Sequence, residues 1–164
     1  MIELLVVIAI IGLLSTFSVI STIRARNLAN VNKAAADVGI YLTAISLLGD
    51  DTGKWPNGCP VEGSANPEVR LDAVQAGLVS EPAIGDQGDG CFWSASDLEK
   101  WNGPYAQVVD DPWGNPYWFD PDFRGYDNCA SKTSFPEDAA VLSFGPNGQG
   151  LNVYDCDDIF KLLP

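Results

Sequence analysis

The fold of this 164-residue chain is decided by its opening stretch, MIELLVVIAIIGLLSTFSVISTI (residues 1–23). The stretch is apolar except for a few small polar side chains and one carboxylate, Glu3, and it is closed by Arg24 and Arg26. At about 1.5 Å per residue, a helix of this length crosses a hydrocarbon layer of about 30 Å. A carboxylate at the edge of such a segment is costly unless it meets a cation or reaches the membrane interface. The stretch therefore predicts a helix that lies in a membrane at one time and in a protein assembly at another.

The helix is predicted to continue past the apolar stretch to about residue 48. No proline occurs between Arg24 and Leu48, and Gly49, followed by two aspartates, is the predicted stop. This amphipathic half, residues 24–49, needs a globular body to pack against, and residues 50–164 are predicted to supply it as one compact domain. Apolar residues recur at the helical spacing of three and four, at Leu28, Val31, Ala35, Val38, Leu42 and Ile45.

Two other interpretations fit an apolar N-terminal run. A cleaved signal peptide would be followed by a small-residue cleavage site, whereas this run is followed by helix-forming residues. A single-span anchor explains the length of the run, but it explains neither Glu3 nor the predicted helix beyond Arg26.

The composition favours an exported, membrane-tethered domain. The net charge is −13, and no basic patch is present, so nucleic acid is not expected as a partner. The chain has no histidine, which removes the commonest general base and the Ser-His-Asp and Cys-His catalytic groupings. We therefore expect no catalytic residues and no enzyme activity.

Four cysteines, Cys59, Cys91, Cys129 and Cys156, show no C-x-x-C spacing, which argues against a structural zinc site. In an oxidising compartment, two disulfides are expected. Three connectivities exist, and closure of local loops favours Cys59–Cys91 with Cys129–Cys156. Four reduced, buried cysteines remain the alternative.

The globular part is predicted to be rich in turns and to have few long elements. Leu71 to Val79 has apolar residues at helical spacing and predicts a short helix that ends at or just after Gly77. Ala83 to Gly90 is predicted to be a loop. Short strands are expected at Tyr105 to Val109, Tyr117 to Phe119 and Ala140 to Phe144, which together indicate a small antiparallel sheet.

The segment from Met1 to Gly12, MIELLVVIAIIG, resembles the N-terminus of the type IV pilin family, which includes the pseudopilins of type II secretion. Mature chains of that family begin Phe-Thr-Leu-Ile-Glu, so the resemblance predicts two further residues before Met1. Many members also carry a proline near the position of Ile20, and this chain has none there.

Three downstream motifs resemble the major pseudopilin of type II secretion, in the same order along the chain. They are DPWGNPY at residues 111–117, SFGPNG at residues 143–148 and DDI at residues 157–159. The residues from Asn57 to Trp101 match no motif of that family. The resemblance implies an α+β fold with a long N-terminal helix packed on a small antiparallel sheet with disulfide-braced loops.

The function that the resemblance implies is that of a structural subunit, which polymerises into a type II secretion pseudopilus or a type IV pilus. The expected partners are further copies of the chain, the inner-membrane assembly machinery and, before assembly, the membrane itself. The subunit would lie in the inner membrane before assembly and in a periplasmic or cell-surface filament afterwards. Filament contacts are expected at Glu3, Leu4, Leu5, Val6, Ile8, Ile10, Ile11, Leu13 and Leu14.

In that family the last two motifs surround a calcium ion, so the resemblance implies calcium as a cofactor here. Asp157 and Asp158 correspond to side-chain ligands, and Asn147 stands where a third acid is usual. Phe144, Pro146 and Gln149 would contribute backbone carbonyls. Calcium takes six to eight such oxygen ligands in a flexible loop. The alternative is a solvated acidic turn braced by Cys156.

Five tryptophans suggest a function of another class, a membrane-anchored glycan- or calcium-binding domain that does not polymerise. Exposed aromatic rings can stack on sugars, although tryptophans in a disulfide-braced fold are more often core residues. Trp93 and Trp101, which lie near acidic and glycine-rich sequence, are expected to be the exposed pair.

Overall fold

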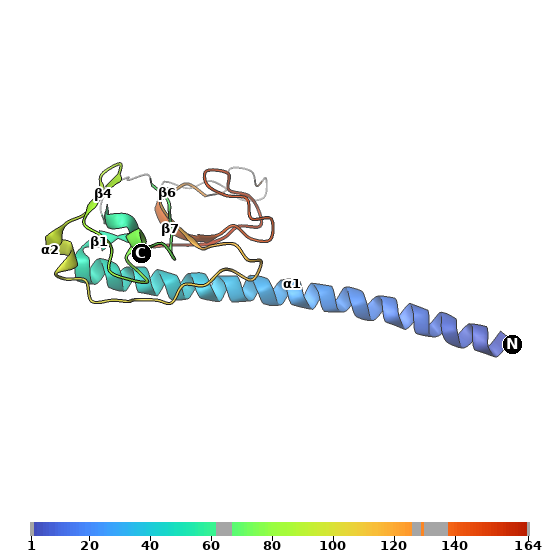
Figure 1. Ribbon diagram of the computed structural model, residues 1–164. Coiled ribbons are helices and arrows are strands. Elements are labelled where there is room, and N and C mark those ends of the chain that lie inside the picture. Colours follow the sequence, from blue (N-terminus) through green and yellow to red (C-terminus); the bar gives the residue numbers. More distant parts are fainter. Residues whose placement is uncertain (1, 62–66, 126–128, 130–137, 164) are drawn as a thin grey trace.

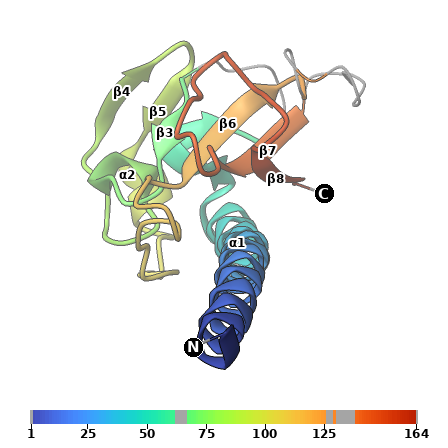
Figure 2. The same cartoon turned by 90° about the vertical axis from the view of Figure 1, so that its right-hand side faces the viewer.

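The computed structural model describes residues 2–61, 67–125, 129 and 138–163, without the side chains of Leu13 and of residues 15–18. The chain is α+β, as expected, with one long N-terminal helix and several small antiparallel sheets (Figures 1 and 2). We call residues 2–33 of the helix the stem, because Ala34 is its first buried residue. We use the name head for the rest of the chain, residues 34–164. Figure 1 shows the stem projecting far beyond the head.

Helix α1 runs without interruption from Ile2 to Thr52, so the stop predicted at Gly49 was wrong by four residues. A Cβ atom on Gly49 would lie 2.6 Å from the ring of Trp55, which shows that this glycine allows close packing of the indole. The helix ends at Gly53, whose φ of 73° is left-handed and therefore favours glycine. The amide of Gly53 still donates to the carbonyl of Gly49, at 2.8 Å, and closes the last turn.

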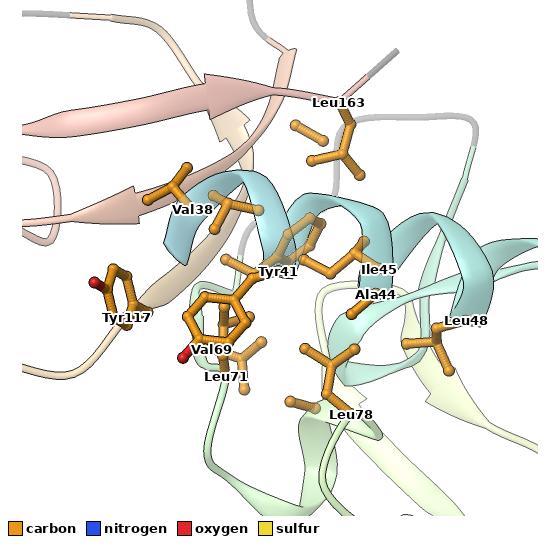
Figure 3. Close-up of a cluster of buried hydrophobic side chains, with 14 of the residues drawn as sticks. Val38, Tyr41, Ala44, Ile45, Leu48, Val69, Leu71, Leu78, Tyr117 and Leu163 are labelled. Carbon is orange, nitrogen blue, oxygen red and sulfur yellow. The ribbon is translucent and has the colours of Figure 1, made fainter. Parts of the chain in front are cut away.

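The main core forms where the second half of α1 meets the head. Val38, Tyr41, Ile45 and Leu48 are buried on one face of α1, and the ring of Tyr117 meets that of Tyr41 edge to face at 4.9 Å (Figure 3). The predicted stripe named Leu28 and Val31 as well, yet both are exposed because the head covers α1 only from Ala34 onward. Complete burial of one large aliphatic side chain contributes about 1.5–3 kcal/mol, so this interface is a principal source of stability. The main core contains Val38, Tyr41, Ala44, Ile45, Leu48, Val69, Leu71, Ala76, Leu78, Trp93, Tyr117, Phe119, Ala139, Val141 and Leu163.

A four-stranded antiparallel sheet forms the platform that packs on α1, in the order β3-β6-β7-β8. The strands expected at Tyr117 to Phe119 and at Ala140 to Phe144 are confirmed in β6 and β7. β6 begins one residue later and ends four residues later than predicted, and β7 begins two residues earlier and ends one residue earlier. The strand bounds are Val69–Arg70 for β3, Trp118–Phe123 for β6, Asp138–Ser143 for β7 and Ile159–Leu162 for β8.

Three local predictions need correction. Tyr105 to Val109 forms no strand; it is an extended segment whose first amide donates to the carbonyl of Leu78. The predicted loop at Ala83 to Gly90 contains strand β4, Gly85–Gly88, which pairs with β5, Cys91–Trp93. Leu71 to Val79 contains only the 3-10 turn η2, Val74–Ala76, although it does end at the left-handed Gly77 as predicted.

The remaining elements are short, and Figure 1 shows β1, β4 and α2 at the end of the head that is far from the stem. Both predicted disulfides, Cys59–Cys91 and Cys129–Cys156, are confirmed. The short helix α2 begins with a capping box, in which Ser94 and Asp97 each accept a hydrogen bond from the other's backbone amide. The elements are β1 (Lys54–Trp55), η1 (Pro56–Gly58), β2 (Cys59–Pro60) and α2 (Ala95–Leu98).

Candidate functional site

The first candidate site is the apolar surface of the stem. Every described side chain from Ile2 to Ala29 is exposed. Leu4 is 70% exposed and Leu14 is 62% exposed, values that are unusual for leucines in a folded domain. Of the residues expected to make filament contacts, the structure describes the side chains of Glu3, Leu4, Leu5, Val6, Ile8, Ile10, Ile11 and Leu14, all exposed; that of Leu13 lies outside the described part.

The stem also contributes the first part of a candidate membrane span, which continues into the head. Among the described residues, the helix from Val19 to Thr52 is long and apolar enough to cross a membrane, and Ile2–Gly12 forms a shorter apolar helix before it. A core helix of a soluble protein would pass the same test if it were buried. Here the apolar side chains that precede Ala34 are exposed, so they need another partner, either lipid or protein.

Tyrosine hydrogen bonds tie the head to the same helix that carries the stem. Tyr117 donates from its hydroxyl to Asp37 at 2.9 Å, and Tyr105 donates to Asp51 at 2.8 Å. Burial raises the pKa of Tyr105 to about 12, and the bond to Asp51 adds to the effect, so the hydroxyl stays protonated and remains a donor at neutral pH. These contacts hold the extended segment between α2 and β6 against α1.

The second candidate site is the place where the motifs seen separately in the sequence come together. Asp111, from the first motif, is buried, and one of its oxygens accepts the amides of Trp113 and Asn115 at 3.0 and 2.8 Å. Its other oxygen accepts the hydroxyl of Ser143, from the second motif, at 2.6 Å. The side-chain amide of Asn115 donates to the carbonyl of Gly145 at 2.9 Å. The first motif therefore fixes the position of the second.

The third motif closes against the second at Gly145. A Cβ atom on Gly145 would lie 2.3 Å from the backbone oxygen of Asp157, and the φ of Gly145 is 59°. Both the space and the backbone conformation therefore require glycine. Asn147 completes the contact, because its backbone amide donates to the Asp157 carboxylate at 3.2 Å.

The side chain of Asn147 occupies the position between the carboxylates. Its NH2 group donates to Asp155 and to Asp157, at 2.8 Å each, while its amide oxygen accepts the backbone N–H of Gln149 at 2.6 Å. An uncharged donor thus offsets two neighbouring anions.

The donor set only partly fits a calcium ion. Carboxylate and amide oxygens are the ligands that calcium prefers, and Asp157 and Asn147 lie together as predicted. Asp158, however, is buried and accepts the backbone amide of Asp155 at 2.7 Å, and the carbonyl of Phe144 accepts the amide of Gly148 at 3.2 Å. In the described part of the chain, no group of three acidic, histidine or cysteine side chains is arranged around one metal position. Pro146 and Gln149 are exposed on the same turn.

Asp155 belongs to this cluster although no motif indicated it. Its carboxylate accepts the amide of Asp157 at 3.1 Å, and the bonds from Asp157 and Asn147 lower the pKa of Asp155. The run of three acids at residues 155, 157 and 158 was the only signal in the sequence that could have pointed to it.

A buried carboxylate, Asp120, anchors Tyr154, which lies next to Asp155 in the sequence. Tyr154 donates from its hydroxyl to Asp120 on β6, and the other Asp120 oxygen accepts the amide of Asp122 at 3.0 Å. Burial raises the pKa of Asp120 to about 7. The ring of Tyr154 packs against that of Phe123, with centroids 4.7 Å apart.

The expectation that Trp93 and Trp101 are exposed was wrong. Trp93 is completely buried and donates from its indole to the carbonyl of Gln75, and Trp101 packs against the main core and donates to the carbonyl of Gly77, both at 2.8 Å. A surface groove of about 550 Å³ does exist on this side of the head, but no tryptophan lines it. Its lining residues are Asp72, Val79, Pro104, Tyr105, Ala106, Gln107 and Val108.

Comparison with known proteins adds no assignment: no family model, no curated protein and no solved structure matches this chain.

Proposed function

We propose that this chain is a structural subunit that polymerises through its N-terminal helix into an extracytoplasmic filament, as a type IV pilin or a type II secretion pseudopilin. The observation that carries the proposal is the exposed apolar stem, which projects from a head that is braced by two disulfides. A stem with this surface cannot remain in water. It can be covered by lipid before assembly and by the stems of other copies afterwards.

The geometry favours an open helical polymer. The head packs on the helix only from Ala34, so the stem can be surrounded on all sides by other stems. Contacts between unlike surfaces of identical subunits generate an open helix when the rotation does not close. The subunit would be held in the inner membrane and added to a periplasmic or cell-surface filament by membrane-bound assembly machinery.

Glu3 is proposed to set the axial position of each subunit. In the membrane it would lie near the interface, and in the filament it would neutralise the N-terminal amine of an adjacent copy. A carboxylate left alone among apolar helices is strongly unfavourable, so this pairing would select one register.

Calcium is proposed as a ligand of the turn cluster formed by Asn147, Asp155 and Asp157. The support is the convergence of three oxygen-bearing side chains where two turns of the chain meet. The ion would take the place of the Asn147 NH2 group, whose amide would turn to present its oxygen. Asp158 would then brace the loop through the amide of Asp155, at 2.7 Å.

Electron microscopy tests the filament proposal against its main alternative, a single-span membrane anchor with a ligand-binding head. The full chain would be expressed in a host that carries a pilus-assembly system, and sheared surface material would be examined. The proposal expects long filaments that contain this chain. Protein that stays in the membrane fraction as single subunits would favour the anchor.

A further inference from the structure

Two arginines form a cationic band between the apolar surface of the stem and the head. Arg24 and Arg26 are exposed, and in the described part of the chain neither has a carboxylate within ion-pair distance. Lys33, the other basic residue of the stem, is already paired with Asp37 at 2.5 Å. The two arginines are therefore the cations of the stem that remain available for another molecule.

Their spacing places them on opposite sides of the stem. Two residues along an α-helix are about 200° apart around its axis, so Arg24 and Arg26 point in nearly opposite directions. In a helical polymer with unlike contacting surfaces, each subunit has neighbours on more than one side. The arginines are thus placed to meet two different neighbours.

The head is their electrostatic complement. Residues 34–164 contain 21 of the 22 acidic residues but only six of the nine basic ones, which gives the head a net charge of −15 and leaves +2 on the stem. Most of these acids cannot be paired within the head, because the cations are too few. Exposed acids are spread over its surface and include Glu81, Asp86, Asp89, Glu99 and Asp110.

We propose that Arg24 and Arg26 dock against the acidic heads of neighbouring copies of this chain, and that these contacts make assembly dependent on ionic strength. The inference deepens the proposed function, on which it rests. When the apolar segments leave the membrane and pack together, the arginines lose the polar bilayer surface beside them. A cation placed among packed helices is costly without an anion, and the neighbouring heads are rich in anions.

The alternative ligand is the phosphate of a lipid headgroup, which the same arginines would meet while the stem is in the membrane. That role would affect retention in anionic membranes without affecting the filament. The experiment therefore measures assembly and vesicle binding separately.

The first arm compares three full-length variants, two of which have the same net charge. Arg24→Glu combined with Arg26→Glu is expected to lower filament yield roughly tenfold or more at low salt, because like charges then face each other. Arg24→Lys with Arg26→Lys should assemble as wild type does. Lys100→Glu with Lys161→Glu is the matched control, because it changes the net charge by the same amount at exposed positions of the head. Its filament yield should fall less than that of the charge-reversed arginine variant. Wild-type yield should also fall as NaCl screens the contact.

The second arm detects the contacts directly, whether or not filaments form. The double-lysine variant, prepared as an equal mixture of 15N-labelled and unlabelled full-length protein, would be treated with a zero-length carbodiimide cross-linker, both in detergent and after assembly. Mixed-isotope peptides that join residue 24 or 26 to an acidic residue of the head would support the proposal. Filaments without such peptides would overturn it and leave the proposed function intact. Cross-links without filaments would leave the docking intact and overturn the proposed function.

The arm with vesicles addresses the lipid alternative. Binding of the wild type and the charge-reversed variant would be measured on vesicles of phosphatidylcholine with and without phosphatidylglycerol. A charge-reversed variant that binds anionic vesicles poorly but assembles as wild type does would show a headgroup contact only, and would overturn the proposal.

Discussion

The stem and the head are parts of one chain and share one helix, yet their apolar side chains point in opposite directions, outward in the stem and inward in the head. In the stem, the described apolar side chains up to Ile23 point outward, and the basic residues lie at its C-terminal end. In the head, the apolar residues of α1 point inward, and hydrogen bonds and disulfides fix the loops. The difference shows that one part of a helix can pack in the core of a folded domain while another part of the same helix leaves its apolar surface exposed for a partner.

Removing the first 23 residues, which carry most of the exposed apolar surface of the stem, should produce the largest effect. A chain that lacks residues 1–23 is expected to be a soluble, acidic monomer that forms no filaments, because the exposed apolar surface has been removed. Analytical ultracentrifugation and electron microscopy would measure this. Filaments formed by the truncated chain would show that the head, and not the stem, drives assembly.

The charge at Glu3 should separate insertion from assembly. Glu3→Ala is expected to insert into membranes as wild type does but to yield few or no filaments, because the axial pairing is lost. Membrane fractionation and counts of sheared filaments would measure the two steps. Glu3→Asp, which keeps the charge, is the control and should retain part of the yield. A normal yield from Glu3→Ala would rule out the pairing.

Within the head, Asp111 should matter far more than its neighbour. Asp111→Ala removes a buried carboxylate that accepts the amide of Asn115 and the hydroxyl of Ser143, and it should lower the free energy of unfolding by about 3 kcal/mol. Asp110→Ala, at an exposed position next to it, should change that free energy by less than about 0.5 kcal/mol. Denaturant unfolding of the detergent-solubilised chain would measure both. Equal losses would mean that Asp111 does not link the two motifs.

The head should become less stable as the pH rises, whereas the stem gives no reason for such a dependence. The folded-state pKa of Asp120 is raised to about 7, above its ordinary value of 3.8. Below about pH 4 the carboxyl is protonated in both the folded and the unfolded chain. Between about pH 4 and pH 7 the unfolded chain loses this proton while the folded chain keeps it, so rising pH favours unfolding. The wild type should lose up to about 4 kcal/mol over this range because of Asp120. Asp120→Asn should flatten this slope, and Asp110→Asn, at an exposed position, should not. An unchanged slope in Asp120→Asn would assign the pH dependence to other groups.

Calcium should have the smallest effect. The clearest test is a substitution that lowers the melting temperature without calcium and raises the stability gained when calcium is added. Asn147→Asp replaces the NH2 donor that faces Asp155 and Asp157 with a third acid. Without calcium the variant should melt a few degrees below the wild type, and with calcium at about a hundred times its Kd it should gain about 2.7 kcal/mol by mass action. Differential scanning calorimetry with calcium or a chelator would measure this, with Asp158→Ala as the variant that should lose the calcium-dependent shift. Identical melting temperatures for the wild type in both conditions would indicate a disulfide-braced acidic turn without a metal.

The sequence by itself determined the long helix, the division between stem and head and two of the three predicted strands, and it favoured the pairing of the cysteines that the structure shows. These features depend on local signals: a continuous apolar run, helical spacing of apolar residues, short apolar segments between turns, and loops closed between nearby cysteines. The apolar residues of the stem were also identified in this way, because their exposure follows from a run that is apolar on every side.

Only the tertiary structure decided what depends on contacts between distant segments. Gly49 looked like a helix stop, but it lies inside α1, where the absence of a side chain leaves room for the ring of Trp55. Trp93 looked exposed from its glycine-rich surroundings, but its indole is buried and donates to Gln75. The meeting of Asp111 with Ser143, across 32 residues of chain, could not be read from either motif alone. Such contacts are set by the packing of the whole head, since the position of each partner is fixed by residues far from it in the sequence.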